Sequence, residues 1–484
     1  MKKRGRGSVL FVLALTAAVG CSTVREAREA QATLAPKSDD AAAAASRARV
    51  DFRGQPLEGL FAFALTNRPS VVSKALAVRD ARLALKALAA DAPVLSGTPW
   101  TAPKLSVSGG HSEASDAVRL DDGRLWRTAG DPSAALSLDL LVYDFGRYAA
   151  QARAQAEQVV AAEVALSDEG FSVFREVAEA YFDFFERRAL LEVAQTNVQR
   201  YAEHLARMEA RRQAGEADRL DVLKARLDLA QAQQAVVTAS NRVETTGATL
   251  LQALGVEVAR GTWQTAFGTA PVGVCSVRRG FAATEEDVGA AFAFARTNAP
   301  ALRAARAKLR AASHSVDAAV ADLYPSVSAT ATLSWADPLW VFRWGVSAAQ
   351  TLFQGFRKTT AVDRAVVALE SAAADVDEAE QKLSVDLETA VASRDNAREA
   401  VASARASLRS AAENLETVRA QFVVGSASRI ELSEAIASDS QARGDCIAAF
   451  YDGQRAEAAI FALTGRAPRF REEVVRDVQR TNEP

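Results

Sequence analysis

Two copies of one pattern, about 210 residues apart, constrain this chain more than any other feature of its sequence. Three pairs of glycines mark the copies, offset by 209 residues in the first pair and by 210 in the other two: Gly146 and Gly355, Gly215 and Gly425, Gly255 and Gly465. The repeat is too long for a solenoid, whose units run to about 20–50 residues. The chain is therefore a duplicated half, and whatever one half builds is built twice.

Charge and cysteine content exclude two broad classes. The net charge is −2, and no basic cluster interleaved with aromatic residues follows the first few positions, which excludes a nucleic-acid partner. Three cysteines at positions 21, 275 and 446 are too few for a disulfide framework. A Cys275–Cys446 bridge is conceivable, but the favoured interpretation is two free thiols that pack as small apolar residues.

The N-terminus has the features of a targeting segment. Basic residues at positions 2–6 precede an apolar run from Val9 to Val19, which is too short to span a bilayer and predicts a signal peptide over residues 1–20. Residues 18–21 resemble a bacterial lipobox that ends at Cys21, which would become a lipidated N-terminus; the alternative is an ordinary signal with an incidental Cys21. Ser22 after Cys21 points, in that resemblance, to the outer membrane. Residues 21–56 would then be a lipidated tether.

The remainder divides by the repeat. We expect a first repeat over 57–255, a linker over 256–283, a second repeat over 284–465 and a tail over 466–484. Each repeat begins with a helical segment (57–90 and 284–322) that contains an Asn-x-Pro sequence, at Asn67 and at Asn298. Two strands, a very long helix, a glycine turn and a shorter helix follow.

The predicted strands alternate with a period of two. From Pro325 to Trp335 one face carries Val, Ala, Leu and Trp while the other carries only Ser and Thr, and residues 340–348 continue the pattern. The first repeat does the same less cleanly over 105–108 and 136–140, joined by a longer polar loop (110–133). This pattern is typical of outer-membrane strands, although a soluble sandwich with one wet face is the alternative. Four strands are too few for a transmembrane barrel, which needs about 8, so the membrane interpretation requires an oligomer.

The long helices predict antiparallel coiled-coil hairpins. No Gly or Pro lies between Phe356 and Val424, and only Gly170 interrupts 147–214, so each run would form a rod of about 100 Å. Apolar residues are spaced alternately three and four apart before each glycine turn: Leu191, Ala194, Val198, Tyr201, Leu205 and Met208, then Val401, Ala404, Leu408, Ala411, Leu415, Val418 and Phe422. After the turns, Leu220, Leu223 and Leu227 match Ile430, Ser433 and Ala437, and we expect these residues to continue the seam.

No catalytic, metal-binding or cofactor-binding pattern is present, which predicts that the chain is not an enzyme and holds no cofactor. Acidic residues directly after the turns are the candidates for function. Glu431 and Glu434 share one helix face, and Asp221 and Lys224 occupy the matching positions of the first repeat. A solvated helix face is the plain interpretation; in a symmetric pore the same carboxylates would form cation-selective rings.

Together these features resemble the TolC family of outer-membrane efflux and secretion channels, in its lipid-anchored branch. The resemblance extends from about Leu57 to Gly465. It rests on the duplicated plan, the Asn-x-Pro of each half, the strand-end motifs 143–147 and 352–357, and the turn motifs beginning at Gly215 and Gly425.

The resemblance implies a mainly α fold with a small β part. Duplicated helical hairpins would form a trimeric α-barrel, and four strands from each of three protomers would close a 12-stranded transmembrane β-barrel in outer-membrane lipid. It further implies the exit duct of a tripartite efflux or type I secretion system, with a periplasmic adaptor at Gly215 and Gly425 and an inner-membrane pump beyond. The alternative is a periplasmic adaptor-like coiled-coil scaffold without a pore. The cargo stays open.

The resemblance also places the gate. Glu431 and Glu434 occupy the positions at which the family narrows its entrance, so we expect them to form the constriction. The polar lock of the family needs a Tyr and an Arg where this chain has Phe422 and Ala427. Closure would therefore depend on Phe422, Arg429 or Asp221. Because the sequences of the two repeats differ most near these positions, the second hairpin is predicted to be the gate.

Overall fold

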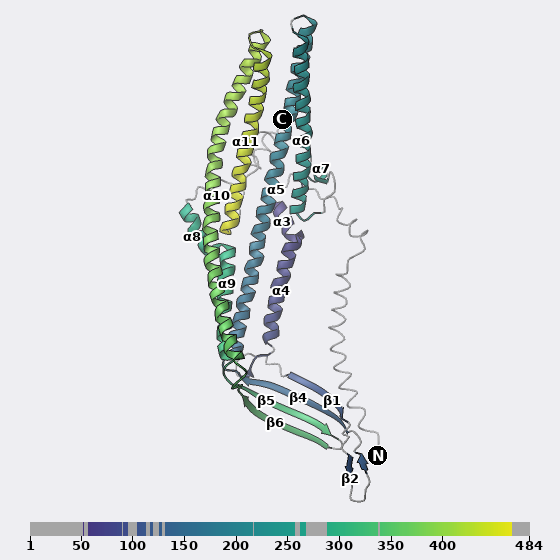
Figure 1. Cartoon of the computed structure of the whole chain (residues 1–484), viewed down its shortest axis with the longest axis vertical. Helices are drawn as coiled ribbons and strands as arrows, with labels where there is room; N and C mark the ends of the chain where they lie inside the picture. Colours follow the sequence, from purple (N-terminus) through teal and green to yellow (C-terminus); the bar gives the residue numbers. More distant parts are fainter. Residues whose placement is uncertain are drawn as a thin grey trace, which may run out of the picture.

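The computed structural model describes residues 52, 57–89, 91–94, 104–112, 117–119, 125–127, 131–215, 217–256, 262–267, 288–336 and 339–466. The predicted signal peptide, Cys21, Cys275 and the turn at Asp337-Pro338 lie outside these residues. The described part is elongated, with two helical hairpins at one end and a curved sheet at the other (Figure 1). No helix in it is both long and apolar enough to cross a membrane.

Two very long helices form the frame of the molecule. The helices α5 (Arg147–Gln213) and α10 (Arg357–Val423) have 67 residues each, about 100 Å at 1.5 Å per residue. Each turns back into a shorter antiparallel helix, α6 (Arg219–Ala253) or α11 (Arg429–Thr464). The two hairpins lie side by side with α5 against α11 (Figure 1). The predicted hairpins and their glycine turns are confirmed.

The helical segment that opens each repeat is two helices rather than one. The first divides into α3 (Leu57–Asn67) and α4 (Pro69–Ala89), the second into α8 (Val288–Asn298) and α9 (Pro300–Ala321). The residue before a proline is disfavoured in helical conformation, and Ala299 is extended at ψ 123°. Both α4 and α9 pack against α5, in the half nearer the sheet (Figure 1).

The structure explains why the last glycine of each repeat recurs. Gly255 and Gly465 both have positive φ, +75° and +69°. A Cβ atom at Gly255 would lie 3.2 Å from the Asn67 carbonyl oxygen, and one at Gly465 would lie 2.9 Å from that of Asn298. The final glycine therefore packs against the Asn-x-Pro bend that opens the same repeat, so the two sequence markers are contact partners.

The main sheet has four antiparallel strands in the order β1–β4–β5–β6. They are β1 (Lys104–Ser112), β4 (Asp131–Tyr143), β5 (Ser326–Ala336) and β6 (Leu339–Ala349). The sheet therefore pairs the strands of the two repeats through β4 and β5. Two short strands, β2 (Ala117–Arg119) and β3 (Leu125–Arg127), form a separate pair within the segment predicted as a plain polar loop.

The register gives the sheet one apolar and one polar face, as predicted. Leu333 lies opposite Leu136 on one side and Phe342 on the other. The next position, Thr332, lies opposite Ser137 and Arg343. Large apolar side chains remain exposed, with Phe342 at 64% and Trp344 at 76%. Neither β1 nor β6 has a second partner among the described strands, so both edges of the sheet are open.

An aromatic core holds the hairpins together at mid-height. It contains Phe174, Phe182 and Phe184 of α5 with Phe450 and Tyr451 of α11. The short helix α7 (Thr262–Phe267) joins it through Trp263, whose indole nitrogen donates to Glu244. Cys446, fully buried in α11, is disulfide-bonded, so the interpretation of two free thiols is wrong. Both other cysteines, Cys21 and Cys275, lie outside the described residues.

Candidate functional site: the junction of the two hairpin tips

Both hairpins turn on a glycine in left-handed conformation. Gly215 has φ +79° and Gly425 has φ +80°. A Cβ atom at either position would meet nothing within 4 Å, so backbone conformation rather than space requires glycine here. Both hairpins therefore turn at the glycines that the sequence predicted, with free space around each glycine.

The second tip ends in a capping box. Ser428, the N-cap of α11, donates its backbone N–H to Glu431 Oε2 at 2.8 Å, and Glu431 donates its own N–H to Ser428 Oγ at 3.2 Å. The two side chains thus each satisfy one backbone donor at the start of α11. Glu434 is exposed, one turn further along. At the first tip the N-cap Asp218 makes no side-chain cap bond.

Phe422 lies between the two hairpins. Its side chain is 3% exposed, and the Arg211 guanidinium lies 4.6 Å from the centre of its ring. Arg211 Nη2 also donates to the Phe422 carbonyl oxygen at 2.9 Å. An arginine at the end of α5 therefore holds both the ring and the backbone at the end of α10.

Arg429 makes the second link. Its Nε lies 3.5 Å from Asp221 Oδ1, and its Nη1 lies 3.5 Å from Asp228 Oδ2. Ser433 of α11 donates to the same Asp228 oxygen at 3.3 Å. Because the Arg429 side chain is only 14% exposed, these charges are partly withdrawn from water. An apolar cluster beneath them also draws on both hairpins, with Met208 and Val222 from the first.

A buried aspartate links α5 and α11 further from the tips. Asp439 is fully buried, 2.5 Å from Arg200 Nη1 and 2.8 Å from Arg443 Nε. Burial alone would raise the pKa of Asp439, but the hydrogen bonds from Arg443 and Arg200 outweigh it and hold the pKa below its usual value. One turn away, Asn197 of α5 donates to Ser440 Oγ of α11.

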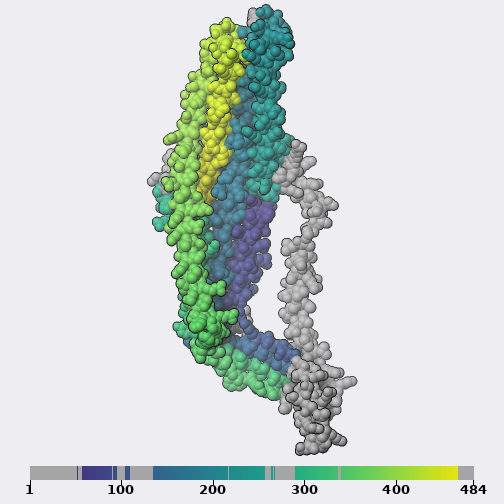
Figure 2. Space-filling view, in the orientation of Figure 1, coloured from purple at the N-terminus to yellow at the C-terminus, as the bar shows by residue number. Residues whose placement is uncertain are grey.

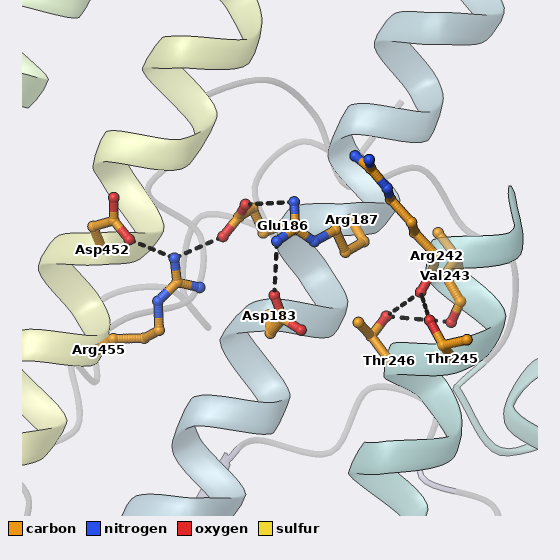
Figure 3. A network of polar contacts seen from close by, with 9 residues as sticks. All are labelled: Asp183, Glu186, Arg187, Arg242, Val243, Thr245, Thr246, Asp452 and Arg455. Carbon is orange, nitrogen blue, oxygen red and sulfur yellow. Dashed lines mark hydrogen bonds and ion pairs between the residues drawn. The ribbon is translucent and has the colours of Figure 1, made fainter. Parts of the chain in front are cut away.

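At mid-height the same two helices meet through a second ion network (Figure 3). The Glu186 carboxylate of α5 forms ion pairs with Arg455 of α11 at 2.8 Å and with Arg187 at 3.2 Å. Arg455 also contacts Asp452 at 2.5 Å, and Arg187 lies 3.4 Å from Asp183. Ion pairs therefore accompany the α5–α11 contact from the core toward the tips.

The seam predicted after the turns is wrong. Leu220, Leu223 and Leu227 are 58%, 50% and 56% exposed. The residues of α6 that pack inside the hairpin are Val222 and Ala225 instead. In α11 they are Leu432, Ala435 and Ile436. The left-handed glycine changes the helical phase, so a heptad register counted along α5 or α10 does not carry across the turn.

The structure brings some of the predicted site residues together. Asp221, Phe422 and Arg429 all belong to the junction of the tips, whereas the side chains of Glu431 and Glu434 take no part in its described contacts. Sequence reasoning missed Arg211 and Asp439. Arg211 lies where the sequences of the two repeats differ most, and such a difference can mark a residue with a role of its own. Asp439 lies one heptad after Leu432 on the buried face of α11, which is an unusual place for an acid.

Solved outer-membrane channels have the same fold. The structure aligns with CusC, described in terms of transmembrane channel formation, at a TM-score of 0.74 and 19% identity over 87% of this chain and 94% of that one. The Campylobacter jejuni CmeC outer membrane channel gives 0.72 and 15% over 88% of both chains. The Neisseria gonorrhoeae MtrE outer membrane channel gives 0.69 and 18% over 85% and 89%. The fold is therefore that of this class of channel subunits.

Sequence comparison identifies the family. The outer membrane efflux protein family matches residues 64–256 and 294–466, and the chain belongs to it. The solvent efflux pump outer membrane protein SrpC of Pseudomonas putida is 30% identical over 200 residues, as is the toluene efflux pump outer membrane protein TtgI of the same species. These matches span 41% of this chain and 39% of each relative's length.

Proposed function

We propose that this protein is the outer-membrane exit duct of a tripartite efflux or type I secretion system. It would work as a homotrimer, with a periplasmic adaptor at its hairpin tips and an inner-membrane pump that selects the cargo. The observation that carries the proposal is an exposed apolar face of α6, which includes Leu223 and Val237. The sequence repeat predicts which helix of a second copy covers this face.

The exposed face of α6 matches a covered face of α11. Val237 is 54% exposed, whereas its repeat equivalent, Ile447, is fully buried in the core that includes α5. Leu223 is 50% exposed, whereas Ser433 donates to Asp228 in the junction. The first hairpin of a second copy would therefore place α6 against α10, the repeat equivalent of α5.

Side-chain sizes support this contact at one pair of positions, where the large and the small residue exchange between the two helices. Within the chain, large residues of α5 meet small ones of α11. A Cβ atom added to Gly444 would lie 3.7 Å from Leu190 Cδ2, and Asn197 bonds Ser440. Between copies, the equivalent of the Leu190–Gly444 pair would be Ala400 of α10 with Gln234 of α6, and that of Asn197 with Ser440 would be Ser407 with Ala230. All four side chains are exposed in the protomer.

The open sheet leads to the same assembly. Within the described sheet both edge strands present unpaired backbone groups, and an exposed apolar face such as that of Phe342 and Trp344 suits lipid. Joining β6 of one copy to β1 of the next would satisfy the edges. Three copies would close twelve strands into one barrel, since each chain supplies four.

Cysteine cross-linking tests the assembly. Ala230→Cys with Ser407→Cys should give dimers and trimers, and nothing larger, on non-reducing gels of outer membranes. The control pairs Ala230→Cys with Arg405→Cys, another exposed α10 position off the inferred contact face. Each single variant reports any background from the native cysteines. Equal cross-linking yields from both cysteine pairs would refute the inferred register of α6 against α10. Cross-linked oligomers larger than a trimer would refute the trimeric assembly.

Electrical recording tests the channel. A trimer of this protein should conduct in planar bilayers, and Glu431→Gln with Glu434→Gln should lower its cation selectivity, because we propose that both carboxylates narrow the entrance. Lys224→Gln, at the matching place on the first hairpin, is the control. Unchanged selectivity in the double variant would remove these residues from the constriction while leaving the channel itself intact.

The anchor needs its own test. We propose that Cys21 is acylated after removal of residues 1–20 and that the tether returns to the helices at Phe52, whose N–H donates to the Ala266 carbonyl oxygen at 2.8 Å. Mass spectrometry of the N-terminal peptide should show the lipid, and Cys21→Ser should lack it. The alternative of a pore-free adaptor-like scaffold finds no support in a fold shared with channels over nearly the whole chain.

A further inference from the structure

A histidine is buried where the two hairpin tips meet. His204 of α5 is 2% exposed, and neither of its ring nitrogens has a hydrogen-bond partner. Its ring centre lies 5.7 Å from that of Phe422 on α10. Buried polar groups are normally paired, so an imidazole without a partner at a contact between two hairpins calls for an explanation.

All the helices of the junction carry charged groups, and those of Arg429, Asp228 and Arg207 act on this ring. By helix, the charged groups of the junction are Glu203, Arg207 and Arg211 on α5, Asp221 and Asp228 on α6, Arg419 on α10 and Arg429 on α11. Burial lowers the pKa of His204, the positive charge of Arg429 lowers it further, and Asp228 opposes them more weakly. The closed junction therefore holds the ring in its neutral form at neutral pH.

We propose that His204 makes the contact between the two hairpin tips sensitive to acid, so that protonation of its ring favours separation of α5 from α10 and α11. An imidazolium has two N–H donors, and the closed junction offers neither of them an acceptor. Separation of the hairpins would let both N–H groups donate hydrogen bonds to water. The contact itself is a feature of the fold; only its consequence, a wider entrance under acid conditions, rests on the proposed channel function.

The direction and size of the effect follow from linkage. Above the ordinary histidine pKa of 6.5 the ring is neutral in both states, so pH has no effect on the contact. Below it the separated state binds a proton that the closed state binds only at lower pH, so acid shifts the equilibrium toward separation. Between pH 7.5 and 5.5 the shift reaches about tenfold per protomer when the closed state stays unprotonated.

The repeat confines this property to one kind of junction. Asn414 stands on α10 where His204 stands on α5, and it is exposed in the protomer. Because an amide side chain does not titrate, the contact between α6 and α10 of neighbouring copies in the proposed ring would lack this response. Acid would loosen the contact inside each chain and leave the contact between chains in place.

Hydrogen exchange of the detergent-solubilised trimer at pH 7.5 and 5.5 tests the proposal, because it detects separation whether or not the protein conducts. Peptides from 205–214 and 429–437 should exchange faster at pH 5.5 than intrinsic chemistry explains, by up to about tenfold. His204→Gln and His204→Leu should both abolish this excess. His314→Gln is the matched control, since His314 lies on α9 in the half nearer the sheet and pairs with Asp317 at 3.5 Å.

The outcomes separate the two ideas. Loss of the excess in both His204 variants with its retention in His314→Gln supports the proposal. An excess that persists without His204, or no excess in the native protein, overturns it. If exchange responds to acid through His204 but bilayer conductance does not, the acid-sensitive contact stands and the proposed gating role at the entrance fails.

Discussion

Removing the charge of Asp439 tests whether the α5–α11 contact depends on its buried ion triad. In Asp439→Asn, Arg200 and Arg443 lose a carboxylate that is fully buried between them, at 2.5 and 2.8 Å. Breaking a buried pair typically costs about 3–5 kcal/mol because the remaining charge stays unpaired. The two arginine side chains are 14% and 30% exposed, so they can recover some hydration. We therefore expect a loss of about 2–3 kcal/mol in the free energy of unfolding.

Thermal melting gives the measurement. Unfolding entropy of about 2.1 cal/mol/K per residue amounts to about 1 kcal/mol/K for 484 residues, so the midpoint should fall by about 2–3 °C. The matched control is Asp445→Asn, an exposed acid on the same helix that accepts from Gln441, and it should melt within about 0.5 °C of the native protein. A triple change of Arg200→Met, Asp439→Leu and Arg443→Met should recover much of the loss, since apolar residues need no partner.

The pH dependence is a further check on the same triad. The pKa of Asp439 is lower in the folded protein, so its contribution is fully present above the ordinary aspartate value of 3.8 and disappears only as pH falls through the folded pKa. The Asn variant should therefore differ from the native protein equally at pH 7.5 and 5.5. An unchanged midpoint in Asp439→Asn, or a triple variant less stable than the single one, would refute the reasoning.

Two other substitutions test local packing and capping. Gly247→Ala would place a Cβ atom 2.8 Å from Trp263 Cγ, so we expect a loss of about 1–3 kcal/mol and a shift in tryptophan emission, whereas Gly444→Ala meets nothing closer than 3.7 Å and should be neutral or stabilising. Ser428→Ala removes half of the capping box and should cost about 1 kcal/mol, visible as faster amide exchange around Glu431; unchanged exchange there would mean that the box contributes nothing.

The repeat made most of the architecture predictable. Its glycine markers located both turns, and strict alternation from Pro325 to Trp335 was enough to place β5 and its apolar face, as the pairing of Leu333 with Leu136 and Phe342 confirms. The pairing of β4 with β5 was not predictable, because it joins the two repeats and no local pattern specifies it. The bends at Pro69 and Pro300 follow from the restriction that proline places on the residue before it, which apolar periodicity alone does not reveal.

The site was less predictable because it consists of long-range pairs. Arg211 and Phe422 are 211 residues apart, and only the fold brings the guanidinium over the ring. The position of Glu431 after the turn predicts a role at the entrance, yet its side chain accepts from the Ser428 N–H at the start of α11. A capping-box sequence explains such an acid locally, before any pore is invoked.

The contacts between the two hairpins differ in kind along their length, and this difference decides where they can part most easily. At mid-height the contact buries large rings such as Phe182 and Phe450, and exposing apolar area costs about 25 cal/mol per Å². At the tips a smaller cluster around Phe422 is joined by the partly buried ion pairs of Arg429, and rehydration of these charges offsets much of the attraction that is lost on separation. Figure 2 shows that the first hairpin also projects slightly beyond the second at this end. Separating the two hairpins therefore costs least free energy at the tips, whether a partner or a proton causes it. The aromatic core keeps the hairpins together at mid-height.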